Sequence, residues 1–205
     1  MPKVGMEPVR RRQMIAATIA TIHEVGFPRT TLAEVAQRAG VSQGLVAHYF
    51  RDKAGLLEAT MRHIAEELKH DLTRTQRGRS DPRDRLAAVL EANFSERSFD
   101  RPTLSAWVAF WGQSHRNRQL GRVQRVLRAR LKSNLVYELR RLLPADEARR
   151  IAMGLSIFVD GLSLRTAMGE RGLDRATART FAFDYLQTQL AHHGVNWERR
   201  DVRLA

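Results

Sequence analysis

The sequence contains no cysteine among its 205 residues, which excludes disulfide scaffolds, cysteine-ligated zinc and thiol chemistry. No apolar run approaches the ~18 residues that a transmembrane helix requires, and residues 1–7 lack the apolar core of a secretory signal. Strand-like alternation and internal repeats are also missing. Since 43% of the residues are apolar, a packed core is possible. We therefore expect a soluble, cytoplasmic, all-α protein.

Acidic residues are scarce relative to basic ones, 22 against 35, and the formal net charge is +13. The excess is uneven, because residues 1–75 hold 11 basic and 8 acidic residues whereas residues 76–205 hold 24 and 14. Much of it falls within residues 116–150. Such a charge favours polyanionic partners without defining a site. A prediction of nucleic-acid binding must rest on a motif.

Helical periodicity and helix-terminus signals divide the chain into two domains and a tail. A first helical stripe containing Ile15, Ile19 and Ile22 stops at Gly26, and the polar stretch 75–82 is a natural linker. We expect a three-helix N-terminal domain over residues 1–60, a C-terminal helical domain over 61–195, and a flexible tail over 196–205. The later helices are predicted at 53–73, 83–97, 102–115, 119–142, 146–168 and 174–192.

Two short helices joined at Gly40 have the spacing of a helix-turn-helix. Thr31 and Glu34 form a capping box at the start of the first helix, and Ser42 can cap the second. Gly40 permits the left-handed turn between them. The small residue at the helix crossing is Ala36, and the buried apolar positions are Val35, Ala39, Val41, Val46 and Tyr49. Such a pair places its second helix in the major groove of DNA.

The residues expected to contact DNA lie on the second helix and at neighbouring helix starts. Gln43 can make a bidentate contact to adenine, and Gly44 lets the backbone approach the bases. Lys53 starts the next helix, where free amides favour phosphates, and Arg11 belongs to a basic cluster that can reach the DNA backbone. An ordinary helical corner without DNA is the alternative. The predicted set is Arg11, Thr30, Thr31, Ser42, Gln43, Gly44, Ala47, His48, Tyr49 and Lys53.

The residues from Thr30 to Ala36, from Gly40 to Ser42 and from His48 to Lys53 resemble the N-terminal domain of TetR-family repressors, and 55–57 continue the match. The resemblance covers about residues 10–60. It implies a homodimer that binds double-stranded operator DNA, and a C-terminal helical domain whose small-molecule effector releases the DNA.

A narrower resemblance links the chain to choline-responsive members of that family, which repress genes of choline uptake and glycine betaine synthesis. It implies choline as the effector. The linker and the residues after Gly194 match less well and carry no inference. The residues that carry this resemblance are 1–6, 48–53, 56–61, 106–107, 110–111, 133–136 and 160–162.

Choline is a quaternary ammonium ion, which proteins hold with aromatic faces and a nearby carboxylate. Trp107 and Trp111 lie four residues apart on one helix face, and Asp160 lies in an apolar segment where an unpaired carboxylate is costly. With the resemblance, these three residues are predicted to form a cage. The alternative is that the tryptophans are core residues and that Asp160 pairs with Arg165. The predicted set also includes Phe94, Phe110 and, for the choline hydroxyl, Asn134.

The last two predicted helices carry broad apolar faces, which we expect at the homodimer contact. The alternative is that these faces close the core of a single chain. The residues concerned are Ile151, Leu155, Phe158, Leu162, Phe181, Tyr185 and Leu186.

Other classes of protein have less support in the sequence. The pairs His63–Glu67 and Glu66–His70 have helical spacing that a metal site would need, but a solvated salt-bridged helix explains them better. No nucleophile elbow, phosphate loop or dinucleotide fingerprint occurs, so we predict no enzyme and no cofactor or metal. A multidrug-type repressor of an efflux pump that senses lipophilic cations, and a non-specific basic DNA binder, remain alternatives.

Overall fold

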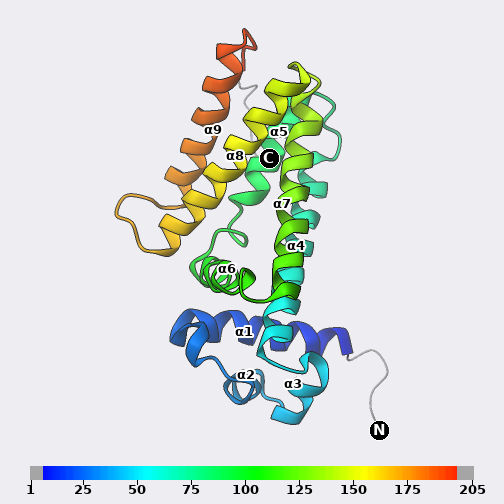
Figure 1. Cartoon of the computed structure of the whole chain (residues 1–205), viewed down its shortest axis with the longest axis vertical. Coiled ribbons are helices and arrows are strands. Elements are labelled where there is room, and N and C mark those ends of the chain that lie inside the picture. The colour runs from blue at the N-terminus through cyan, green and yellow to red at the C-terminus, as the bar shows by residue number, and fades with distance from the viewer. Residues whose placement is uncertain (1–6, 198–205) are drawn as a thin grey trace. The chain divides into compact units, whose positions relative to one another are not determined.

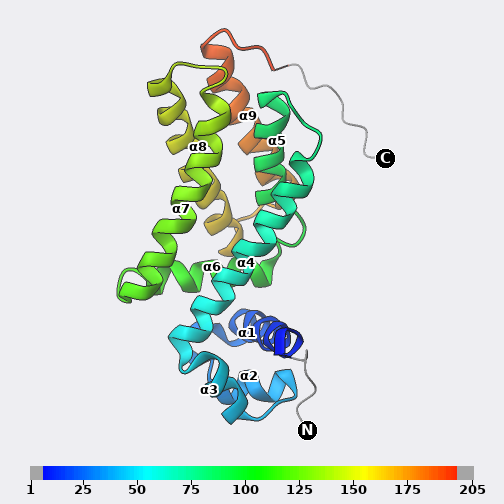
Figure 2. The same cartoon turned by 90° about the vertical axis from the view of Figure 1, so that its right-hand side faces the viewer.

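The computed structural model describes residues 7–197, which contain nine helices and no strand (Figures 1 and 2). The prediction of an all-α fold is confirmed. Residues 1–6, which carry part of the resemblance, and residues 198–205 of the predicted tail lie outside the described range. The helices are α1 (Glu7–Arg29), α2 (Leu32–Ala39), α3 (Gln43–Phe50), α4 (Lys53–Gln76), α5 (Pro82–Asn93), α6 (Arg101–Ser114), α7 (Arg118–Leu139), α8 (Ala145–Ala167) and α9 (Arg175–His192).

The helices form two compact units that divide the chain differently from the predicted domains. The first unit extends to His70 and takes in Glu96–Leu127, and the second holds Asp71–Ser95 and the chain from Arg128. Helices α4 and α7 each run from one unit into the other. The helices of the DNA-binding motif therefore share a unit with α6 and the first half of α7.

Within the first unit, α2 and α3 lie on one side of α1 and α6 lies on the other (Figures 1 and 2). The positive φ of 75° at Gly26 interrupts the helical path near the end of α1, where the sequence predicts a stop. A hydrophobic core joins α1, α2, α3 and the start of α4. Its buried members are Met14, Ile15, Ala17, Val35, Ala36, Val46, Phe50, Leu56 and Ala59.

The local signals around the turn form the predicted hydrogen bonds. The Thr31 hydroxyl accepts from the Glu34 amide at 3.2 Å, and the Glu34 carboxylate accepts from the Thr31 amide at 2.8 Å. Gly40 has the left-handed φ of 64° and ψ of 35°. The Ser42 hydroxyl accepts from the Leu45 amide at 3.2 Å. The capping box, turn and second cap are thus confirmed, and they fix where α2 ends and α3 begins.

Helix α5 is shorter than the predicted 83–97, because it ends at Asn93. Phe94 and Phe99, which follow it, are 1% and 4% exposed. The chain leaves the helical path over these residues, which allows both rings to be buried. The Asp100 carboxylate then accepts from the Thr103 amide at 2.7 Å and starts α6.

In the second unit, α8 and α9 lie side by side and α5 packs against α9 (Figure 1). Among its buried residues is one carboxylate, Glu138 of α7, whose side chain is 2% exposed. Arg85 and Arg141 both pair with it. The buried apolar side chains of this unit include Leu86, Val89, Leu90, Leu135, Leu139, Ile151, Leu155, Leu186 and Leu190.

Candidate functional site

The first turn of α3 forms an exposed polar surface in the first unit. Ser42, Gln43 and Gly44 are exposed, and His48 is exposed one turn later. A Cβ atom at Gly44 would meet nothing within 4 Å, so the surface is open there. Because Val46 and Phe50 bury the opposite face of α3 in the core, these polar groups face solvent.

The residues beside this surface are more varied in their exposure. Ala47 and Tyr49 are half-buried, and Tyr49 packs against the core. Thr31 is exposed, whereas Thr30 is only 1% exposed and donates its hydroxyl proton to the Gly26 carbonyl at 3.0 Å. Thr30 therefore departs from the exposed position expected of a DNA contact. Its hydroxyl instead stabilises the end of α1.

The two basic residues of the predicted set have contacts within the protein. The Lys53 ammonium donates to the Pro28 carbonyl at 3.0 Å and lies 4.4 Å from the centroid of the Phe27 ring. Burial lowers the pKa of Lys53, and the Glu34 carboxylate acts in the opposite direction. The exposed Arg11 guanidinium lies 5.6 Å from the centroid of the Phe50 ring. The Arg11 cation thus lies beside α3, and the Lys53 ammonium lies at the end of α1.

Arg51, between α3 and α4, is a residue that the sequence did not single out. Its φ of 64° and ψ of −62° form a tight turn in which the Asp52 amide donates to the Phe50 carbonyl at 2.7 Å. This conformation is uncommon and strained for a residue other than glycine. The exposed Arg51 side chain makes no ion pair with another residue of the described range 7–197. It adds a free cation to this surface.

The aromatic residues of the predicted cage belong to the hydrophobic core of the first unit. The Trp107 and Trp111 rings have centroids 5.8 Å apart and are tilted by 33°. Both are half-buried and pack against a core that includes Met61 and the fully buried Phe110. The one-turn spacing thus does bring the two indoles together. Part of each indole remains exposed, whereas Phe110 is fully buried in the core.

The other three predicted effector residues belong to the second unit. Phe94 is 1% exposed. Asn134 is exposed, one position before the buried Leu135, so it does not lie on an apolar face of α7 as expected. The helical rotation of 100° between neighbours explains the difference. Asn134 has no buried surroundings in this chain that would favour a ligand.

Asp160 pairs with Arg128, 3.7 Å away, and not with Arg165, which pairs with Glu170. Its side chain is 39% exposed. Burial raises the pKa of Asp160, although the positive charge of Arg128 acts in the opposite direction. The carboxylate thus lies in a setting where its charge is only partly compensated.

The apolar side chains of α8 and α9 divide into a set that is buried within the chain and a set that is exposed. Of the residues predicted at a dimer contact, four are buried within the chain: Ile151, Leu155, Leu162 and Leu186. Phe158 and Tyr185 stack at 5.2 Å, and Phe181 is exposed. A second stripe, missed in the sequence although its spacing is helical, is exposed on the outside of α8. It consists of Met153, Ile157, Leu164 and Met168.

Comparison with known families identifies both parts of the chain. The model for bacterial regulatory proteins of the tetR family matches residues 14–60, and the model for the C-terminal domain of BetI-type transcriptional repressors matches residues 82–191. The chain belongs to the TetR family. The helix-turn-helix and the fold predicted from the sequence are confirmed.

Curated TetR-family relatives match this chain almost from end to end. The HTH-type transcriptional regulator BetI of Burkholderia cenocepacia is 48% identical over 93% of this chain and 99% of its own length. The regulator of the same name from Burkholderia mallei is 49% identical over 93% and 98%. These relatives are transcriptional regulators and not enzymes.

Solved structures of transcriptional regulators have the same fold. One from Pseudomonas aeruginosa PAO1 has a TM-score of 0.73 and 26% identity, covering 92% of this chain and 95% of that one. One from Saccharomonospora viridis, solved in complex with choline, has a TM-score of 0.78 and 19% identity, covering 88% and 96%. No helix within residues 7–197 of this TetR-family protein has the length and apolar character needed to span a bilayer.

Proposed function

We propose that the protein is a dimeric repressor of genes for choline uptake and glycine betaine synthesis, which binds operator DNA and releases it when choline binds. The observation that carries the proposal is the match of the C-terminal half to BetI-type repressors together with near end-to-end relatives of that name. Because its target is DNA, we place its action in the cytoplasm.

The exposed start of α3 supports sequence readout by this helix. In a helix-turn-helix the early residues of the second helix meet base edges, and here Ser42, Gln43 and Gly44 are exposed at that position. The Gln43 amide can bond two atoms of an adenine edge. The cations of Arg11 and Arg51, which flank α3, and that of Lys53 at the start of α4 suit the phosphates on either side.

The test of readout is a fluorescence-anisotropy titration with DNA from upstream of the protein's own gene, against a scrambled duplex of equal length. Gln43→Ala is expected to weaken operator binding by about 10-fold and to leave scrambled DNA unchanged, since a bidentate base contact is worth roughly 1–3 kcal/mol. The matched control is Gln37→Ala, on the exposed face of α2. Equal binding of operator and scrambled DNA by the unaltered protein would contradict the proposal.

Arg51 is proposed to contact a phosphate, so its substitution should affect binding differently from that of Gln43. Arg51→Gln is expected to weaken operator and scrambled DNA alike, and to reduce the slope of log affinity against log salt by about 0.9. The control is Arg77→Gln, an exposed arginine in the turn after α4. An unchanged salt slope in the Arg51 variant would exclude the contact.

Two features of this chain support binding of choline, and each is proposed separately because they belong to different units. The partly exposed faces of Trp107 and Trp111 offer π surfaces, on which a desolvated quaternary ammonium gains ~2 kcal/mol. Asp160 offers a partly buried carboxylate whose negative charge is only partly compensated by Arg128. The regulator from Saccharomonospora viridis, which has the same fold, was solved in complex with choline, and this supports choline as the ligand proposed here.

Choline release is tested in the same titration. Choline is expected to weaken operator binding, whereas 3,3-dimethylbutan-1-ol, in which carbon replaces the charged nitrogen, is expected to have no effect. Trp107→Ala and Asp160→Asn should each require at least about 10-fold more choline for the same release. Tyr137→Ala, an exposed aromatic of α7 to which no role is assigned, is the control. Retention of full choline sensitivity in Trp107→Ala, Trp111→Ala and Asp160→Asn would refute these assignments.

The exposed stripe on α8 supports dimerisation through the last two helices. Met153, Ile157, Leu164 and Met168 lie on one helix face, and Phe181 is exposed on the neighbouring α9. Contiguous exposed apolar surface of this kind marks interaction sites. A second copy of the same face would cover it in a two-fold symmetric contact.

Light scattering after gel filtration tests this contact. Ile157→Glu is expected to convert the dimer to a monomer, because isoleucine is 63% exposed at the centre of the stripe and a buried glutamate would lack a partner. Val126→Glu provides the control, since Val126 is an exposed apolar residue of α7 outside the stripe. A dimer unaffected by Ile157→Glu would place the contact elsewhere.

A further inference from the structure

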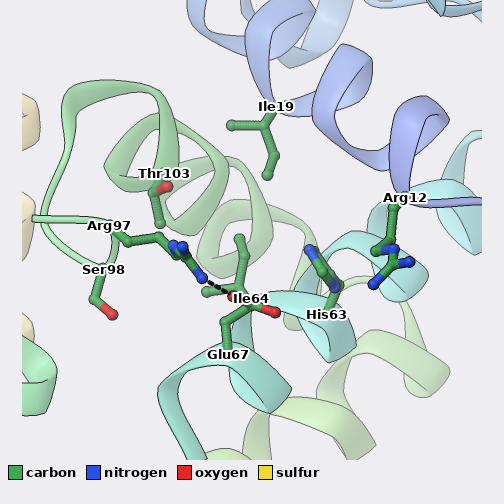
Figure 3. A pocket seen from close by; sticks show the side chains of 8 residues that line it. All are labelled: Arg12, Ile19, His63, Ile64, Glu67, Arg97, Ser98 and Thr103. Carbon is green, nitrogen blue, oxygen red and sulfur yellow. Dashed lines mark hydrogen bonds and ion pairs between the residues drawn. The ribbon is translucent and has the colours of Figure 1, made fainter. Parts of the chain in front are cut away.

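A cavity of about 300 Å³ lies in the first unit, at the junction of α1 with α4 and the start of α6 (Figure 3). Its volume is at the lower end of the range for small-molecule sites. Helix α1 contributes Arg12 and Ile19, and α4 contributes His63, Ile64 and Glu67. The remaining lining comes from Arg97, Ser98 and Thr103, around the start of α6.

The charge of this lining excludes choline. The lining contains two guanidinium groups, from Arg12 and Arg97, and one carboxylate, from Glu67. The Arg97–Glu67 ion pair, drawn as a dashed line in Figure 3, compensates that carboxylate within the cavity. The lining therefore has a net positive charge, and it includes no tryptophan, tyrosine or phenylalanine that could hold a quaternary ammonium. The ligand that complements it is an anion.

Arg12 and His63 give the cavity its unused donors. They lie on the right-hand side of Figure 3, away from the Arg97–Glu67 pair. Within the described residues 7–197, neither side chain has a hydrogen bond or an ion pair. A carboxylate accepts charge-assisted hydrogen bonds from such groups, and those with arginine are among the strongest in proteins. Arg12 and His63 come from different helices and can share one ligand.

The apolar part of the lining indicates what else the ligand contains. Ile64 is 7% exposed and Ile19 is half-buried. Both line the cavity together with the charged groups. A bare inorganic anion would leave these side chains in contact with water. A short aliphatic chain attached to the anion would cover them and gain free energy in proportion to the area removed from water.

We propose that this cavity binds a small aliphatic carboxylate, with the carboxylate on Arg12 and His63 and the alkyl chain on Ile19 and Ile64. The lining includes none of the proposed choline residues, and the site does not depend on the proposed function. It lies where α1, which carries Arg11 beside α3, meets α4.

The experiment is an NMR titration of the ¹⁵N-labelled full-length protein with butyrate, followed at the resonances of residues 12, 19, 63 and 64. Butyrate is expected to shift these resonances, and butyramide, which has the same shape without the charge, is expected to bind at least 10-fold more weakly. Acetate should bind about 15-fold more weakly than butyrate, because each methylene buried contributes about fourfold. Inorganic phosphate should not displace butyrate.

Variants test the part of the site that binds the carboxylate. Arg12→Gln and His63→Gln are each expected to weaken butyrate at least 10-fold, and Arg10→Gln, an exposed position on the same helix, should leave it unchanged. Folding is checked by comparing the remaining amide resonances. The proposal is overturned if butyrate shifts none of the four residues, if butyramide or phosphate binds as well as butyrate, or if Arg10→Gln weakens butyrate as much as Arg12→Gln.

Discussion

Replacing the buried carboxylate of Glu138 with an amide tests how the second unit is held together. The Glu138 side chain is 2% exposed, and it pairs with Arg85 and, at 2.9 Å, with Arg141. These arginines also bond the chain between α4 and α5, because Arg141 donates to the Ser80 carbonyl at 2.9 Å and Arg85 donates to the Arg79 carbonyl at 3.4 Å. One carboxylate therefore positions α5 and the turn before it against α7.

The expected loss of stability follows from how exposed the side chains of Glu138, Arg85 and Arg141 are. Removing one member of a fully buried ion pair costs roughly 3–5 kcal/mol, because the other charge is left without compensation. Here the Arg85 and Arg141 side chains are 27% and 43% exposed, so water can solvate part of their charge. We therefore expect Glu138→Gln to lower the free energy of unfolding by about 2 kcal/mol. This exceeds the effect of a typical surface ion pair.

Urea unfolding followed by circular dichroism, at fixed protein concentration, measures this difference. For a slope near 2 kcal/mol per molar urea, the midpoint should fall by about 1 M. The matched control is Glu147→Gln, where the carboxylate is 35% exposed and pairs with Arg150 at 2.7 Å, and its cost should stay within about 0.5 kcal/mol. If Glu138→Gln cost no more than Glu147→Gln, the carboxylate would not organise this unit.

Three further substitutions probe the first unit and Asp160. Gly55→Ala would place a Cβ atom 2.2 Å from the Phe50 carbonyl oxygen. It should therefore destabilise the connection of α3 to α4 and abolish operator binding in the anisotropy assay. The control, Gly112→Ala, places a Cβ atom that meets nothing within 4 Å and should leave operator binding unchanged. Thr31→Ala removes the capping hydroxyl of α2 and should lower the stability of that helix by about 1 kcal/mol. Amide hydrogen exchange in α2 should then be faster, and unchanged exchange would contradict the role of the cap. Burial raises the pKa of Asp160 above its value in the unfolded chain, so the charged carboxylate opposes folding at neutral pH. Asp160→Asn should therefore raise Tm at pH 7, and the difference in Tm between the variant and the unaltered protein should vanish as the pH falls below the ordinary aspartate range. A lower Tm of the variant at pH 7 would refute this.

The predicted helix-turn-helix depended on interactions between residues close in the chain. Thr31 and Glu34 bond each other across three residues, Gly40 alone supplies the left-handed turn, and Ser42 caps the helix that follows it. Hydrogen bonds of this range are nearly independent of the rest of the fold. Their residue types and spacing therefore predicted both the elements and the exposed surface of α3.

Long-range packing decided what local patterns left open. Helical spacing placed Trp107 and Trp111 together, but it did not indicate that Phe110, between them, is fully buried. It also offered Arg165 as the alternative partner of Asp160, whereas the partner is Arg128, which comes from a different helix, 32 positions earlier. The burial of a side chain depends on which elements pack over it, and this is set by the whole chain.

The sequence by itself determined that this chain is helical, where α2 and α3 begin and end, and which family it belongs to, because caps, turn residues and motif spacing act locally. Only the tertiary structure decided that Thr30 is buried and that Glu138 is enclosed by two arginines. It also revealed the outer stripe of α8 and the cavity between Arg12 and Arg97. These features arise where segments distant in the sequence exclude water from one another, and no local pattern encodes which segments meet.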